Sequence, residues 1–184
     1  MMGLFFGASS FNGDISKWDV SGVTDTNQMF QGAKLFNGDL SAWNVGRVAD
    51  MSFMFQDAHS FDQEISSWDV RSVENMSFMF GGAKSFNQDV SAWDVSRVLR
   101  MDGMFNKAIQ FNANIAGWDV SQVENTELML FNAESFNRDL SGWDVSSITG
   151  MGGMFAGASA LHKDLCEWGS KLQEGNSHKF LALI

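Results

Sequence analysis

Acidic side chains recur at a fixed interval in this chain, and they have the clearest capacity for chemistry. An Asp or Asn directly follows a tryptophan at six positions: Asp19, Asn44, Asp69, Asp94, Asp119 and Asp144. Carboxylates bind cations, accept hydrogen bonds and pair with basic groups. If successive repeats stack, neighbouring carboxylates lie ~4.8 Å apart and repel by ~1 kcal/mol per pair even in water. Some compensating interaction is therefore required.

Three arrangements could supply that compensation. In the first, each Asp accepts hydrogen bonds from the backbone two residues on or from nearby serines. The serines in question are Ser21, Ser96, Ser121 and Ser146, and Arg47, Arg71 and Arg97 could assist them. In the second, a basic protein partner faces the column. In the third, Ca²⁺ binds there, although one carboxylate per repeat is few for an ion that takes about six to eight oxygen ligands.

A second acidic column lies close to a column of asparagines. Its members are Asp14, Asp39, Glu64, Asp89, Asp139 and Asp164. The neighbouring column consists of Asn12, Asn37, Asp62, Asn87, Asn112, Asn137 and His162. We expect turns and a ladder of asparagine hydrogen bonds in this part of each repeat.

Catalytic motifs are missing from the pattern. His59, His162 and His178 occupy different positions of the repeat, and Cys166 stands in a column that is otherwise Ser or Ala. No nucleophile elbow or phosphate-binding loop is found. We therefore predict a protein that is not an enzyme, with no cofactor and no metal site.

The charge and the apolar runs exclude further classes. The net charge is −10 and there is no run of Lys and Arg, which argues against nucleic acid as a partner and allows a basic protein. The longest apolar stretch, residues 180–184, is far shorter than the ~20 residues that span a bilayer. No secretion signal is evident at the start of the chain.

The elements that position these columns are set by a tryptophan every 25 residues. The tryptophans are Trp18, Trp43, Trp68, Trp93, Trp118, Trp143 and Trp168. A fixed period of this size is typical of stacked repeats, in which neighbours complete one another's core. We expect the tryptophans to form a core ladder.

The apolar spacing inside a repeat predicts two short elements. Trp-x-Val has a period of two and indicates a short strand. The following Val-x-x-Met-x-x-Met-Phe-x-x-Ala has a period near three to four and indicates a short helix. Asp25, Asp50, Asn75 and Asn125 would be its N-caps, and Gly7, Gly32, Gly82 and Gly157 would end it.

The repeated phrase F-N-x-D-[IL]-S-x-W-D-V-S-x-V-x-x-M-x-x-M-F-x-x-A resembles the repeat of bacterial surface proteins. It is similar to the BspA-like leucine-rich-repeat group and to the mycoplasma repeat domain of unknown function. The resemblance implies an α/β repeat fold, namely an LRR-like right-handed solenoid of about seven 25-residue units. It also implies roles in adhesion or protein binding, at the cell surface or after secretion.

The ends of the chain depart from the pattern. Residues 1–168 form the repeat region, which starts in mid-repeat, and residues 169–184 are expected to form a degenerate C-terminal cap or tail. Terminal repeats have to cover an apolar cross-section. No N-terminal cap is evident.

These observations lead to two hypotheses about function. The first is a protein-binding or adhesion module that presents an acidic strand face. The residues of that face are Asp19, Asn44, Arg47, Asp69, Arg71, Asp94, Arg97, Asp119, Gln122 and Asp144. The second is a structural subunit of a larger assembly, docked through the uncapped N-terminal end and the C-terminal tail.

Overall fold

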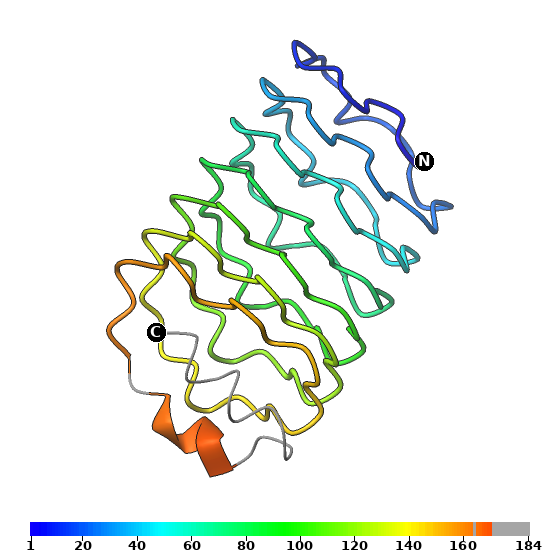
Figure 1. Cartoon of the computed structure of the whole chain (residues 1–184). Helices are drawn as coiled ribbons and strands as arrows, with labels where there is room; N and C mark the ends of the chain where they lie inside the picture. The colour runs from blue at the N-terminus through cyan, green and yellow to red at the C-terminus, as the bar shows by residue number, and fades with distance from the viewer. Residues whose placement is uncertain (164, 171–184) are drawn as a thin grey trace.

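The chain forms a stack of similar coils of 25 residues each (Figure 1). The computed structural model describes residues 1–163 and 165–170. We number the complete coils from coil 1, residues 11–35, to coil 6, residues 136–160. Successive coils lie side by side, with the blue N-terminal residues at one end of the stack. The expected cap falls largely outside the described residues, since only residues 169–170 of it are included.

The predicted α/β solenoid, with a strand and a helix in every unit, is wrong. In the described part of the chain the helical structure is η1 (Cys166–Ser170), a single 3₁₀ element. The β-structure there consists of isolated parallel bridges between adjacent coils, starting with Asp25 to Asp50 and ending with Asn125 to Gly150. Turns and irregular segments form the rest of each coil.

The Met-Phe segment has helix-like spacing because it consists of successive turns. Met54 N–H bonds to the carbonyl of Met51, three residues earlier, at 3.2 Å. The N–H groups of Phe53 and Phe55 instead bond to Ser77 and Met79 of the next coil, at 2.8 Å each. An α-helix would direct every N–H to the carbonyl four residues earlier. Here every second donor joins two coils, so the segment cannot be helical.

The Trp-x-Val segment alternates between buried and exposed residues without forming a strand. Trp43 N–H bonds to the Leu40 carbonyl at 3.0 Å, and Val48 N–H bonds to the Val45 carbonyl at 2.9 Å. Each apolar residue therefore lies at a turn, and the polar residue between them points outward. A local turn produces the same alternation as a strand.

The residues assigned as helix caps serve turns instead. Asp25 accepts a hydrogen bond from Asn27 N–H at 2.8 Å, and Asp50 accepts one from Ser52 N–H at 2.7 Å. Gly32 and Gly82 have φ of 74° and 72°, the left-handed region expected of a helix end, but each lies within a turn. An Asp or Asn acceptor and a glycine with positive φ occur both at helix ends and in turns, so these residues do not distinguish the two.

Two large residues adopt a backbone conformation that normally favours glycine. Phe53 and Phe78 have φ of 59° and 53°, while Gly103 has φ of 61° at the same position of coil 4. Their rings stack at a centroid distance of 5.5 Å, and the Phe78 ring covers Gly103, where a Cβ would lie 2.3 Å from it. Ring stacking and this contact offset the strain of about 1–3 kcal/mol that such a backbone costs.

The core consists of apolar ladders that run through the stack. Trp93 is 4% exposed, and its Nε1–H donates to the Ile65 carbonyl of the preceding coil at 3.1 Å. The same bond recurs for every tryptophan from Trp43 to Trp168. Phe55 and Phe61 lie beside this ladder with ring centroids 3.9 Å apart. The predicted tryptophan ladder is therefore present from Trp43 to Trp168, and it carries side-chain hydrogen bonds as well as apolar contacts. Trp18, its first predicted member, is instead 40% exposed at the end of the stack.

Candidate partner-binding face

Two rows of polar side chains run along the stack above the buried tryptophans. The Trp-adjacent row consists of Asp19, Asn44, Asp69, Asp94, Asp119 and Asp144, all exposed. The loop row consists of Asp14, Asp39, Glu64, Asp89, Asn114 and Asp139, also exposed. Asp164, the last predicted member of the loop row, lies outside the described residues. The residues between the two rows include an exposed position that is mostly Ala, Gly or Ser.

Members of the Trp-adjacent row accept hydrogen bonds within their own turn. Asp19 Oδ1 accepts from Ser21 N–H at 3.0 Å and from Ser21 Oγ at 2.6 Å, and Asp94 accepts from Ser96 at 3.1 and 2.6 Å. Neighbours in the row also lie close together. A Cβ on Gly46 would lie 3.4 Å from both the Asn44 and the Asp69 side-chain oxygens.

The loop row repeats this arrangement five residues earlier. Asp14 accepts from Ser16 N–H at 3.0 Å, and Asp89 accepts from Ser91 N–H at 2.9 Å. The adjacent asparagine ladder joins the coils: Asn37 N–H donates to Asn12 Oδ1 at 2.8 Å, and the bond recurs up to His162. The expected turns and ladder are thus present in the described residues.

Two asparagines show that the turns require an oxygen acceptor and not a charge. Asn44 Oδ1 accepts from Gly46 N–H at 3.2 Å, in the place where Asp69 and Asp94 stand in the next coils. Asn114 Oδ1 accepts from Ala116 N–H at 3.2 Å in the loop row. An amide therefore makes the same turn, and the negative charge of the remaining members exceeds what the fold needs.

Hydrogen bonding keeps these carboxylates ionised. Bonds from Ser21 hold the pKa of Asp19 below its usual value, and bonds from Ser96 do the same for the pKa of Asp94. The side-chain hydrogen bond from Arg71 lowers the pKa of Asp69 to about 2. The lowered pKa values of Asp19, Asp69 and Asp94 favour the charged form of these three carboxylates.

The three predicted arginines have different partners. Arg71 Nη2 pairs with Asp69 Oδ2 at 2.8 Å. Arg97 Nη2 lies 3.6 Å from Glu74 Oε1, so it turns away from the Trp-adjacent row. Arg47 is exposed and makes no ion pair within the described residues, and Gln122 is exposed as well. The ten described carboxylates of the two rows outnumber the three arginines of the face, so the face is negative overall.

Among the described residues, no group of three or more His, Cys, Asp or Glu side chains is arranged to hold a metal ion. Within the same residues, no helix has the length and apolar content needed to cross a bilayer.

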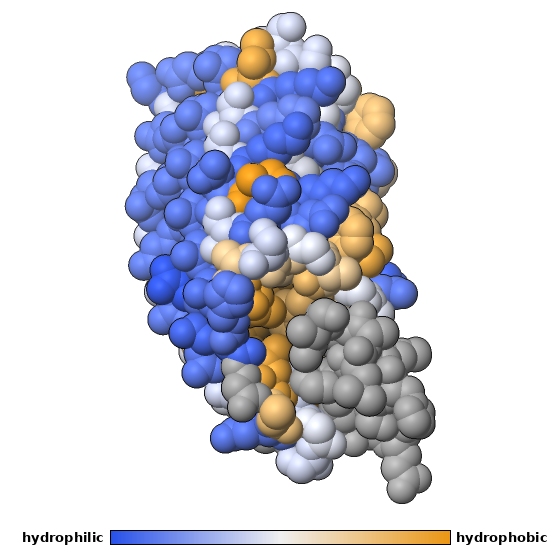
Figure 2. All heavy atoms as spheres, turned by 60° about the vertical axis from the view of Figure 1, so that its left-hand side comes forward, coloured by the Kyte–Doolittle hydropathy of each residue, from blue (hydrophilic) through white to orange (hydrophobic). Residues whose placement is uncertain are grey.

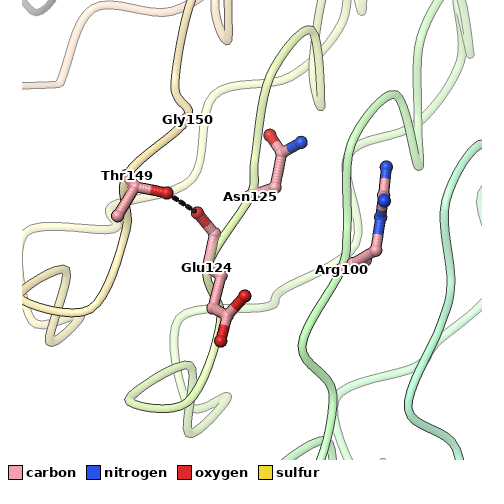
Figure 3. Close-up of a pocket in the computed structure, with 5 residues that line it drawn as sticks. All are labelled: Arg100, Glu124, Asn125, Thr149 and Gly150. Carbon is pink, nitrogen blue, oxygen red and sulfur yellow. Dashed lines mark hydrogen bonds between the residues drawn. The ribbon is translucent and has the colours of Figure 1, made fainter.

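A shallow cleft is lined by residues of coils 4, 5 and 6, and sequence reasoning did not identify it. Its lining residues are Arg100, Glu124, Asn125, Thr149 and Gly150, and its volume is about 260 Å³. Thr149 Oγ1 donates to the Glu124 carbonyl at 3.2 Å, and the Arg100 and Glu124 head groups point in opposite directions (Figure 3). The sequence does show that this position of the repeat varies, because Arg100 and Gly150 stand where other coils have Asp or Asn.

One face of the molecule carries both hydrophilic and hydrophobic residues (Figure 2). In Figure 2 hydrophilic residues cover most of the face in view, while hydrophobic residues gather in its lower half and along its right edge. The described chain is thus a turn-rich repeat protein whose exposed side chains form rows along a stack.

The family assignment agrees with this class of protein. The chain belongs to the family described as "Mycoplasma protein of unknown function, DUF285", which matches residues 1–89 and again residues 63–168. No curated protein sequence matches the chain.

Proposed function

We propose that this protein is a non-enzymatic binding module whose two acidic rows contact a basic protein partner. The observation that carries the proposal is the charge in excess of structural need. Asn44 and Asn114 form the same turns without charge, yet ten other described members of the two rows are acidic. Packing alone therefore does not account for the carboxylates.

The geometry suits an extended basic segment. The carboxylates of each row occupy the same position in successive coils and so form lines along the stack. The cationic side chains of an extended segment can contact them one after another. Exposed charges of one sign attract an opposite partner most strongly at low ionic strength. The resemblance of the repeat to bacterial surface proteins supports adhesion as the setting for such binding.

The proposal can be tested with an oligolysine peptide and a triple variant, Asp94→Asn, Asp119→Asn and Asp144→Asn. The turns should persist, since Asn44 already serves as the acceptor in its coil. Each exposed ion pair contributes about 0.2–1 kcal/mol, so the loss of three should weaken binding by a factor of roughly 3 to 140. Fluorescence anisotropy at low and high salt measures the change.

The matched control changes the net charge by the same amount at positions outside the two rows. Glu124→Gln, Glu127→Gln and Glu134→Gln remove three exposed carboxylates that belong to neither row. We expect the control to bind the peptide nearly as tightly as the unchanged chain. An equal loss of affinity in both triple variants would show that net charge, and not this face, governs binding.

A further inference from the structure

Two Asn-Gly pairs lie at the start of the first two coils, at Asn12-Gly13 and Asn37-Gly38. Neither glycine has a positive φ. The equivalent position carries Gln63 in coil 3. A Cβ on Gly13 or Gly38 would lie 3.0 or 2.9 Å from the ring of the phenylalanine two residues earlier. The turn in coil 3 nevertheless carries Gln63 beside Phe61, so a small shift of the ring admits another residue. The pairing of asparagine with glycine has chemical consequences of its own.

The asparagine side chains are held in a state that favours attack on their amide carbon. Asn12 Oδ1 accepts a hydrogen bond from Asn37 N–H at 2.8 Å, and Asn37 Oδ1 accepts one from Asp62 N–H at 2.9 Å. A backbone N–H directed at this oxygen stabilises the negative charge that develops on it when a nucleophile adds to the carbon. The ladder thus activates the amide as well as joining the coils.

The nucleophile for that attack is the backbone nitrogen of the following glycine. Within the described part of the chain, the N–H groups of Gly13 and Gly38 make no hydrogen bond. Residues 12–14 and 37–39 make no backbone–backbone hydrogen bonds there either, so these loops can rearrange locally. Glycine has no Cβ to shield its nitrogen, and it permits the widest backbone rotation.

We propose that Asn12 and Asn37 are sites of spontaneous deamidation in the folded protein. The glycine nitrogen forms a bond to the Asn Cγ and loses its proton, and the bond from Cγ to the amide nitrogen breaks. That nitrogen leaves as ammonia. Water then opens the five-membered succinimide ring at either carbonyl and yields aspartate or isoaspartate. The only co-reactant is water, and no atom changes its oxidation state.

The two products have different effects on the stack. Aspartate fits, because Asp62 already occupies this ladder and its Oδ1 accepts from Asn87 N–H at 2.9 Å. Isoaspartate inserts a methylene group into the main chain and shortens the side chain. It removes the acceptor from its place and disturbs the register of coils 1 to 3. The reaction therefore adds negative charge at one end of the stack and, through isoaspartate, loosens that end.

The chain provides internal controls for a test of this proposal. Asn87 precedes Gln88 and Asn112 precedes Ala113, and both asparagines accept the same ladder bond as Asn12 and Asn37. The folded chain is incubated at mildly alkaline pH and then digested. Mass spectrometry locates each gain of one mass unit, and labelling by an isoaspartyl methyltransferase identifies isoaspartate. We expect conversion at Asn12 and Asn37 to be several-fold faster than at Asn87 and Asn112.

A double variant, Gly13→Gln and Gly38→Gln, isolates the role of glycine. Conversion at Asn12 and Asn37 should fall to the rate of Asn87. The thermal midpoint of unfolding, measured in parallel, reports the cost of moving the Phe11 and Phe36 rings, which a Cβ at these positions would approach to 3.0 and 2.9 Å. Equal rates at Asn37 and Asn87 in the folded chain would overturn the proposal, because the ladder would then protect the asparagines. Unchanged rates in the double variant would overturn it as well.

Discussion

The tryptophan ladder makes a quantitative prediction for the substitution Trp93→Phe. Trp93 is 4% exposed, and its ring lies between those of Trp68 and Trp118 at centroid distances of 6.4 and 6.5 Å. Its Nε1–H bonds to the Ile65 carbonyl at 3.1 Å. Phenylalanine keeps an aromatic ring in the core but removes this donor and leaves part of the space empty.

The magnitude follows from the two losses. The Ile65 carbonyl retains a bond from Trp68 N–H at 3.1 Å, so the substitution does not leave it without a donor. The lost hydrogen bond then costs about 0.5–1.5 kcal/mol, and the cavity adds about 1–2 kcal/mol. We expect the free energy of unfolding to fall by about 1.5–3.5 kcal/mol in total.

The matched control is Trp18→Phe, which alters the same position of coil 1. Trp18 is 40% exposed, and no hydrogen bond of its Nε1 is found within the described residues. Its replacement should cost less than about 1 kcal/mol, as surface substitutions usually do. Urea unfolding followed by the remaining tryptophan fluorescence measures both variants. Equal losses would refute the argument that the bonded, fully packed ladder stabilises the middle of the stack.

Two further predictions concern strain and acid. Gly103→Ala should cost about 1–3 kcal/mol, because a Cβ would lie 2.3 Å from the Phe78 ring at a φ of 61°. Gly22→Ala, where a Cβ meets open space, should change stability by less than about 0.5 kcal/mol in the same thermal melts. Asp69, whose pKa the bond from Arg71 lowers to about 2, stabilises the folded state above the ordinary Asp pKa of 3.8. This contribution should be lost as the pH falls from about 4 to about 2. Asp69→Asn should make the urea midpoint of unfolding less dependent on pH in that window. An unchanged pH dependence would contradict the assignment of this stability to Asp69.

The repeat, the buried columns and the local hydrogen bonds of the acidic residues could be predicted from the sequence. Each depends on residues within one repeat or on the 25-residue period itself. The secondary structure could not be predicted in the same way. Val-x-x-Met-x-x-Met-Phe has helix-like spacing because turns also return the chain to the core every three to four residues. Spacing reports which side chains face inward and does not report where the backbone N–H groups bond.

The cleft around Arg100 illustrates the same limit at a site. Arg100 and Gly150 are unremarkable in isolation, and a lining of residues from neighbouring coils forms only when those coils stack. The Arg97 side chain is a similar case, since its pairing with Glu74 rather than with the Trp-adjacent row depends on the relative height of two coils. A side chain as long as arginine can reach several carboxylates, and the stacking of the coils decides which of them it pairs with.

The sequence by itself determined that this protein is a repeat whose tryptophan, methionine and phenylalanine columns are buried and whose acidic columns face outward. Hydrophobicity and local turn chemistry act over a few residues, so they can be read from one repeat. The tertiary structure alone decided that the repeat contains neither strand nor α-helix in the described chain. Phe53 and Phe55 donate to the next coil while Met54 closes a turn in its own. That division of hydrogen bonds exists only once a neighbouring coil presents its carbonyls at the right height.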